Sequence, residues 1–126
     1  MAGLYYPELS TTILDAAYKV HSALGPGLLE SVYETCLEYE LQQRGCAVKR
    51  QLILPIVYQG IIIDNGYRID LLVDDTIILE LKSVTVFSDV HHKQLLTYLR
   101  LSGKKVGYLM NFNVPSFKDG FHRKVV

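Results

Sequence analysis

The stretch YRIDLLVDDTIILELK, residues 67–82, decides the fold of this chain. Its two ends are apolar, β-branched runs typical of strands, and residues 74–76 between them form a short polar loop. Asp70 interrupts the first run, and Glu80 and Lys82 interrupt the second. Ionised side chains inside a buried strand cost free energy unless they are paired or bind something. The stretch therefore predicts a strand hairpin that carries a candidate active site.

The length of the hairpin loop determines whether the two acids meet. A loop with an odd number of residues, such as 74–76, places Asp70 opposite Glu80 with β-carbons about 4.5–5.5 Å apart, whereas a two-residue loop places them on opposite faces. Two carboxylates about 5 Å apart repel by roughly 3 kcal/mol at an effective dielectric of 20. A divalent cation relieves that repulsion, and oxygen ligands favour Mg²⁺ or Mn²⁺. The odd register therefore predicts a metal site beside Lys82.

The same charges have a purely structural interpretation. Glu80 and Lys82 share a face of their strand and can form an ion pair with each other, while Asp70 pairs with Arg68 or Lys82. Perturbed charges also occur in structural networks, so the hairpin alone leaves both interpretations open.

The composition limits the class of protein. We expect one domain, residues 1–126, because this length buries an adequate core without disulfides or structural metal. Thirteen Lys and Arg balance thirteen Asp and Glu, so attraction to nucleic acid requires a local basic patch. The start has no leader-like pattern and no apolar run reaches the length of a membrane span, so we expect a cytoplasmic protein without membrane contact. Cys36 and Cys46 have no zinc-type spacing.

Periodicity predicts an α/β protein in which helices flank one mixed sheet, in the order ααβββαβ. Helices are expected at 13–24, after cap candidates at 10–12, at 29–44, and at 90–101 after Ser88. Strands are expected at 48–58, interrupted by Pro55, at 61–73, bent at Asn65-Gly66, and at 76–83, 106–112 and 120–126.

A motif outside the hairpin resembles a known family. Gly27, Glu30 and Tyr33 reproduce the GxxExxY signature, with Glu30 in the first turn of the second helix. Phrases at 21–27, 67–73, 78–83 and 111–114 look like the same GxxExxY protein family. That family is assigned to the PD-(D/E)XK nuclease-like superfamily, so the resemblance implies a restriction-endonuclease-like core. Ile69 stands where many members have proline.

The resemblance implies a metal-dependent nuclease that hydrolyses phosphodiester bonds of nucleic acid, most naturally DNA. It assigns the metal to Asp70, Glu80, the Leu81 carbonyl and Glu30, with Mg²⁺ or Mn²⁺ as cofactor, and it makes Lys82 the residue that orients the attacking water. Glu30 also has a simpler explanation, since an acid favours the positive end of a helix.

The third helix contains a further element of the resemblance. Gln94 and Tyr98 lie four residues apart and resemble the QxxxY element of exonuclease-type members, in which the glutamine supports the catalytic lysine and the tyrosine faces nucleic acid. Tyr33 and Arg68 are further candidates for substrate contact, although Tyr33 and Tyr98 also fit the role of core or rim aromatics. A catalytically silent module that binds nucleic acid or protein is the alternative function. The sequence does not determine the oligomeric state, and a homodimer is one possibility.

Overall fold

The computed structural model describes residues 5–64 and 66–126. It is an α+β fold built from a mixed sheet and flanking helices. The elements in chain order are α1 (Pro7–Leu24), α2 (Glu30–Gln43), β1 (Val48–Ile53), β2 (Ile56–Tyr58), β3 (Ile61–Ile63), β4 (Arg68–Val73), β5 (Ile77–Lys82), α3 (Asp89–Ser102), β6 (Val106–Asn111), the 3₁₀ helix η1 (Phe117–Asp119) and β7 (Phe121–Val125).

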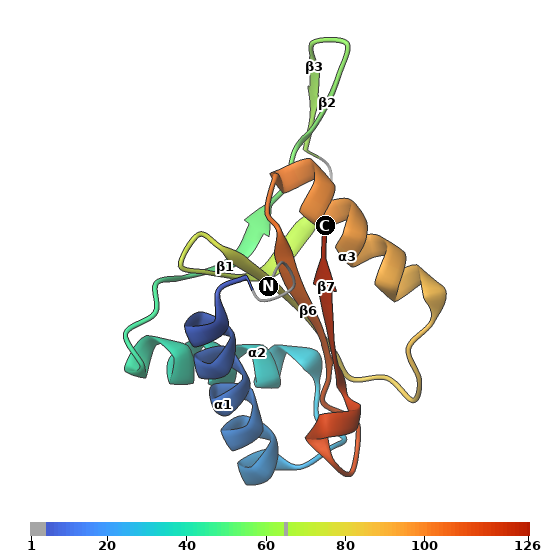
Figure 1. Ribbon diagram of the computed structural model, residues 1–126. Helices are drawn as coiled ribbons and strands as arrows, with labels where there is room; N and C mark the ends of the chain where they lie inside the picture. Colours follow the sequence, from blue (N-terminus) through green and yellow to red (C-terminus); the bar gives the residue numbers. More distant parts are fainter. Residues whose placement is uncertain (1–4, 65) are drawn as a thin grey trace.

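The main sheet has five strands in the order β1-β4-β5-β6-β7 (Figure 1). Among the described strands of this sheet, the β5–β6 pair is parallel and the other pairs are antiparallel, and α3 forms the crossover that a parallel pair requires. Helices α1 and α2 cover one face of the sheet and α3 covers the other. The expected architecture of one mixed sheet between helices is confirmed.

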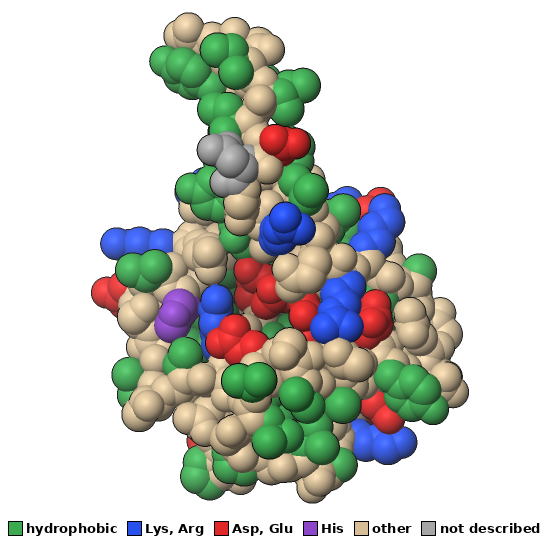
Figure 2. Space-filling view, turned by 180° about the vertical axis from the view of Figure 1, so that it is seen from behind, with side chains coloured by type: hydrophobic (Ala, Val, Ile, Leu, Met, Phe, Trp, Pro, Cys, Tyr) green, Lys and Arg blue, Asp and Glu red, His purple; other side chains and the backbone are tan. Residues whose placement is uncertain are grey.

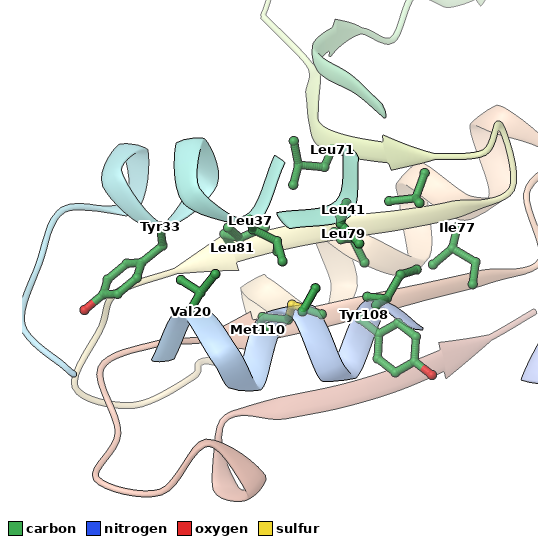
Figure 3. Close-up of a cluster of buried hydrophobic side chains, with 14 of the residues drawn as sticks. Val20, Tyr33, Leu37, Leu41, Leu71, Ile77, Leu79, Leu81, Tyr108 and Met110 are labelled. Atoms are coloured by element: carbon green, nitrogen blue, oxygen red, sulfur yellow. The ribbon is translucent and has the colours of Figure 1, made fainter. Parts of the chain in front are cut away.

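Strand β5 lies at the centre of the core. Leu79 and Leu81 pack against α1 and α2 (Figure 3). Ile78 packs on the other face, against α3. A strand covered on both faces needs apolar residues at nearly every position, which explains the continuous apolar run in the sequence. Glu80 is buried within this run, so its carboxyl group must be satisfied by the protein or by a ligand.

Helix α1 begins earlier than the sequence predicts. The expected caps at residues 10–12 lie inside the helix, which starts at Pro7, a residue suited to the first helical turn. The hydroxyls of Thr11 and Thr12 donate to the carbonyls of Pro7 and Glu8 one turn back, so these side chains do not act as caps. The predicted caps were therefore wrong. Ser88, by contrast, caps α3 in a capping box with His91, as expected.

The strand predicted at 61–73 divides into two. Strand β3 leaves the main sheet and pairs only with β2 among the described residues, forming a two-stranded hairpin that projects from the body (Figure 1). We call residues 56–63 the arm. Gln59 and Gly60 both have positive φ at its tip, as a tight hairpin turn requires. Of the bend expected at Asn65-Gly66, Asn65 lies outside the described residues, while Gly66 forms a bend with a φ of 116°.

None of the helices in residues 5–64 and 66–126 is long and apolar enough to cross a bilayer.

Candidate active site

The register of β4 and β5 brings the two hairpin acids together. Residues 74–76 form the three-residue loop, and Leu71 pairs with Leu79 at the last step of the ladder. Asp70 and Glu80 are the next residues along the two strands, so they lie opposite each other as the odd loop predicts. The geometric condition that the sequence placed on an active site is therefore met.

Next to the Leu71–Leu79 pair, the carboxylates of Asp70 and Glu80 accept main-chain N–H groups of the opposite strand. The Asp70 N–H donates to Glu80 Oε2 at 2.9 Å, and the Leu81 N–H donates to Asp70 Oδ2 at 2.8 Å. Carboxylate oxygens thus accept N–H groups that a regular ladder would direct at carbonyls. Each acid is held in place by the backbone of the opposite strand, which fixes the two carboxyl groups as one unit.

The surroundings of Glu80 disfavour the ionised form of its carboxyl group. It is 3% exposed, and its pKa is raised well above the usual value, first by burial and then by the charge of Asp70. The Lys82 ammonium opposes this shift only in part. Burial and these two carboxyl groups also raise the pKa of Tyr98 to about 12, so its hydroxyl stays protonated beside the acids. The site therefore favours a proton or a cation at Glu80.

The ion pairs of the structural interpretation, Glu80–Lys82 and Asp70 with Arg68 or Lys82, are not among the ion pairs of the described residues. In the described part of the chain, the ion pairs are Lys19–Glu40, Arg44–Glu40, Arg50–Glu34, Arg50–Glu38 and Lys104–Asp75. Neither Asp70 nor Glu80 has a Lys or Arg partner within ion-pair distance, and the half-buried Lys82 has no acidic partner among these residues. The charges of the hairpin remain available for a ligand.

A cleft of about 200 Å³ opens between α2 and the hairpin. Glu30, Glu34, Gln51, Asp70 and Leu81 line it together with Ser31. Figure 2 shows acidic side chains gathered in a hollow of this face, with basic side chains beside them and the arm above. Glu30 Oε2 accepts the Ser83 N–H at 3.1 Å, which ties the first turn of α2 to the end of β5. The predicted helix acid therefore reaches the same cleft as Asp70.

Two polar residues of this cleft, Glu34 and Gln51, were not predicted from the sequence. Gln51 Nε2 donates to Glu34 Oε1 at 2.7 Å and to Asp70 Oδ1 at 3.2 Å. Arg50 Nε lies 3.2 Å from Glu34 Oε2, while burial, followed by the Asp70 charge, raises the pKa of Glu34. Glu34 was detectable, since it lies four residues after Glu30 on the same helix face. The left-handed conformation of Gln51, at φ 51°, has no signal in the sequence.

Gln94 and Tyr98 line a second cleft, of about 300 Å³, on the α3 side of the sheet. They share a helix face, as their spacing predicts. Within the described residues, however, Gln94 makes no hydrogen bond to Lys82 or to either hairpin acid. Arg68 is exposed at the start of β4, next to the base of the arm. The structure thus places Tyr98 near the acids but gives Gln94 no direct contact with them.

Tyr33 is a structural residue and does not face the cleft. Its ring is fully buried and stacks on Phe112 at 4.5 Å between centroids. Its hydroxyl donates to the Gly25 carbonyl at 2.6 Å and accepts the Leu28 N–H at 3.1 Å, which fixes the α1–α2 corner. The expected contact between Tyr33 and a substrate is therefore corrected: Tyr33 supports the turn that presents Glu30.

Other residues of the family-like phrases also support the site. Asn111 accepts the Val84 N–H and donates to the Val84 carbonyl, which holds the loop after Lys82. His21 Nε2 lies 2.7 Å from the Val114 carbonyl oxygen. These contacts connect α1 to residues 111–114, and residues 111–114 to the loop that follows β5.

The role of Tyr33 gives a stability prediction. Tyr33→Phe keeps the stacked ring but leaves the Gly25 carbonyl and the Leu28 N–H without this partner. We expect the free energy of unfolding to fall by about 1–3 kcal/mol in urea denaturation, without a loss of metal affinity. Tyr39→Phe is the control, since this exposed hydroxyl has no hydrogen bond among the described residues. Equal stability of the two variants would contradict the structural role.

The donor set fits a small hard cation. In residues 5–64 and 66–126, no three Asp, Glu, His or Cys side chains converge closely enough to form a metal site by themselves. Mg²⁺ commonly takes only one or two carboxylates and completes its coordination with water and substrate oxygens. The buried Glu80 and the adjacent Asp70 supply two carboxyl groups whose mutual repulsion a cation would relieve.

Comparison with known proteins agrees with this geometry. No curated protein and no solved structure matches the chain at a significant level. A family model does match it, over residues 7–124, which include both α2 and the whole β4–β5 hairpin. Its description is the PD-(D/E)XK nuclease superfamily. The chain belongs to the PD-(D/E)XK nuclease superfamily.

Proposed function

We propose that this protein is a metal-dependent nuclease that hydrolyses phosphodiester bonds, and that it belongs to the GxxExxY group of its superfamily. The observation that carries the proposal is the pair of hydrogen bonds between Asp70 and the Glu80–Leu81 segment, which unites two acids that have no cationic partner among the described residues. Without a cation, this repulsion is relieved only by a proton on Glu80, whereas a bound cation would relieve it with both carboxylates ionised.

Asp70 and Glu80 are the proposed metal ligands, together with the Leu81 carbonyl and Glu30. Mg²⁺ or Mn²⁺, when bound, supplies the positive charge that stabilises a phosphodiester under attack. Gln51 orients Asp70, and Glu34 in turn holds Gln51. The Gln51 amide nitrogen donates to the side-chain carboxylates of both Glu34 and Asp70. The proton that burial favours on Glu80 leaves when the cation is held there.

Lys82 is the proposed catalytic lysine. It stands two residues after Glu80 on the same strand face, and no carboxylate neutralises it within the described residues. Its ammonium orients the attacking water and stabilises negative charge that develops on the phosphate. Gln94 is the proposed residue that positions Lys82 once substrate is bound.

The proposed substrate is nucleic acid, and DNA is the first choice. Arg68 at the rim and the Tyr98 hydroxyl beside the acids are the proposed substrate contacts. The chain carries no net charge, so binding depends on such local groups and is expected to weaken as salt increases.

A substrate panel tests this function. Wild-type protein with Mn²⁺ is incubated with single-stranded, duplex and branched DNA and with RNA, beside a Lys82→Ala variant purified in parallel. We expect the wild type to cleave at least one substrate and Lys82→Ala to lose at least about 10²-fold in rate. Cleavage that survives unchanged in Lys82→Ala would assign the activity to a contaminant or to another site. Binding without any cleavage would favour the silent module.

A further inference from the structure

The second cleft, which Gln94 and Tyr98 line, lies on the face of the sheet that carries Glu80. Ile78 of β5 packs against α3, and side chains two residues apart on a strand share a face, so Glu80 and Lys82 face the α3 side as well. The buried ring of Tyr98 lines the cleft, and its hydroxyl lies beside the acids. A nucleic acid strand with a phosphate at Glu80 and Lys82 can therefore extend into this cleft.

Tyr67 presents an aromatic ring to the same cleft. It lines the cleft and is 44% exposed, although its ring packs nearly perpendicular to that of Tyr98, with centroids 6.3 Å apart. The Tyr67 carbonyl accepts the Leu54 N–H at 2.8 Å, which fixes the backbone that carries the ring. An aromatic ring that its neighbours hold in place, and that stays open to solvent, is the kind of platform on which proteins stack nucleobases.

The other walls of the cleft supply charge and a hydrogen-bond donor. Lys93 is exposed there and has no acidic partner within ion-pair distance in the described part of the chain. Thr97 Oγ1 accepts a hydrogen bond from Arg100 Nη2 at 3.2 Å, which leaves the hydroxyl proton free to donate. The cleft holds about 300 Å³, the lower end of the range for small-ligand sites. Ring, cation and donor match the base, phosphate and base edge of one nucleotide.

We propose that this cleft binds one unpaired base of the substrate strand, stacked on Tyr67, while Lys93 contacts an adjoining phosphate. The proposal rests on the proposed nuclease function for the identity of the ligand, and it specifies the substrate class as single-stranded nucleic acid or a melted strand end. Bases inside a duplex already stack on their neighbours and reach a protein ring only when they are extruded. Stacking also adds affinity that does not depend on charge, which suits a chain without net charge.

Fluorescence anisotropy with a labelled single strand of about 12 nucleotides, within the usual range of single-strand site sizes, tests this pocket. Every protein carries Lys82→Ala to slow cleavage while Mn²⁺ is present. We expect Tyr67→Leu to raise the dissociation constant about 5- to 100-fold, through the loss of one stacked base, and Tyr67→Phe to bind like the parent protein. Tyr39→Leu removes an exposed ring from α2, is the matched control, and should bind unchanged.

A strand of the same length made of abasic nucleotides identifies the contact as one to a base. This strand keeps the phosphates and lacks every base. The parent protein should bind it at least about 5-fold more weakly than the base-containing strand. Tyr67→Leu has already lost the stacking contact, so it should bind the abasic strand as tightly as the parent does. If the circular dichroism of Tyr67→Leu differs from that of the parent, the comparison of the two strands with the parent protein decides alone.

Three outcomes would overturn the base pocket. They are undiminished binding of the base-containing strand by Tyr67→Leu, equal binding of both strands by the parent, and equal weakening by Tyr67→Leu of binding to a blunt duplex, which would show that the ring does not act on an unpaired base. Failure of the nuclease function gives a different result, namely binding without cleavage when Lys82 is intact. A protein that binds no strand at all contradicts both proposals.

Discussion

Asp70→Asn is expected to abolish metal-dependent cleavage while the protein remains folded. The substitution removes one of the two charges proposed to hold the cation, so we expect a loss of at least about 10³-fold in rate, as for other essential catalytic groups. The fold tolerates the change because the asparagine Oδ1 can still accept the Leu81 N–H. The Gln51 amide, which donates to Asp70 and to Glu34, keeps its hydrogen bond to Glu34 and gives up only the longer one to position 70.

Single-turnover cleavage and thermal unfolding measure the two halves of this prediction. Asp75→Asn is the matched control on the same hairpin. Asp75 lies in the loop, and its pair with Lys104 at 3.2 Å is exposed, so little stability or activity depends on it. Retention of wild-type cleavage by Asp70→Asn would remove Asp70 from the site. An unfolded variant would show that the carboxylate is needed for the fold itself.

Glu80→Gln is expected to make the metal-free protein more stable and inactive. The raised pKa means that the folded protein holds a proton at Glu80 more tightly than the unfolded chain does. This contribution to stability is complete below the unfolded-state pKa of about 4.3 and is lost as pH rises through the folded-state pKa. Glutamine keeps the hydrogen bond from the Asp70 N–H but never ionises, so it avoids that loss.

Thermal unfolding in EDTA at pH 4 and pH 8 measures this effect. At pH 8 the variant should gain about 1–3 kcal/mol, the usual cost of a buried polar group that is not satisfied, which raises Tm by several degrees. At pH 4 the difference should nearly vanish. Glu8→Gln, at an exposed position in the first turn of α1, is the control and should change stability by less than about 1 kcal/mol. A wild type that is more stable than Glu80→Gln at pH 8 would contradict the assignment of Glu80 as a strained, unpaired acid.

The central part of the fold could be predicted because two strong signals agree. The alternation and apolar runs of residues 67–82 specify a buried hairpin, and the odd loop at 74–76 specifies which residues face each other. Ser88 and Gly103 mark the ends of α3 because capping chemistry is local. Local signals of this kind need no knowledge of the tertiary structure.

The parts that could not be predicted depend on distant contacts. Gln51 reaches Asp70 only because its backbone is left-handed within a strand, which neighbouring residues do not specify. Tyr33 belongs to a motif, yet its hydroxyl serves the α1–α2 corner, and the motif alone does not distinguish support from substrate contact. The arm was missed because its apolar residues look like a core strand, although they are exposed.

Calorimetric titration with Mn²⁺ measures whether Asp70 and Glu80 bind a cation, and it does so without the substrate. Wild type, Asp70→Ala and Glu80→Ala are titrated in the same buffer, with Asp75→Asn as the control. We expect saturable binding to the wild type and to Asp75→Asn, and at least about 100-fold weaker binding to both alanine variants. Indistinguishable titrations of the wild type and the two alanine variants would contradict this expectation.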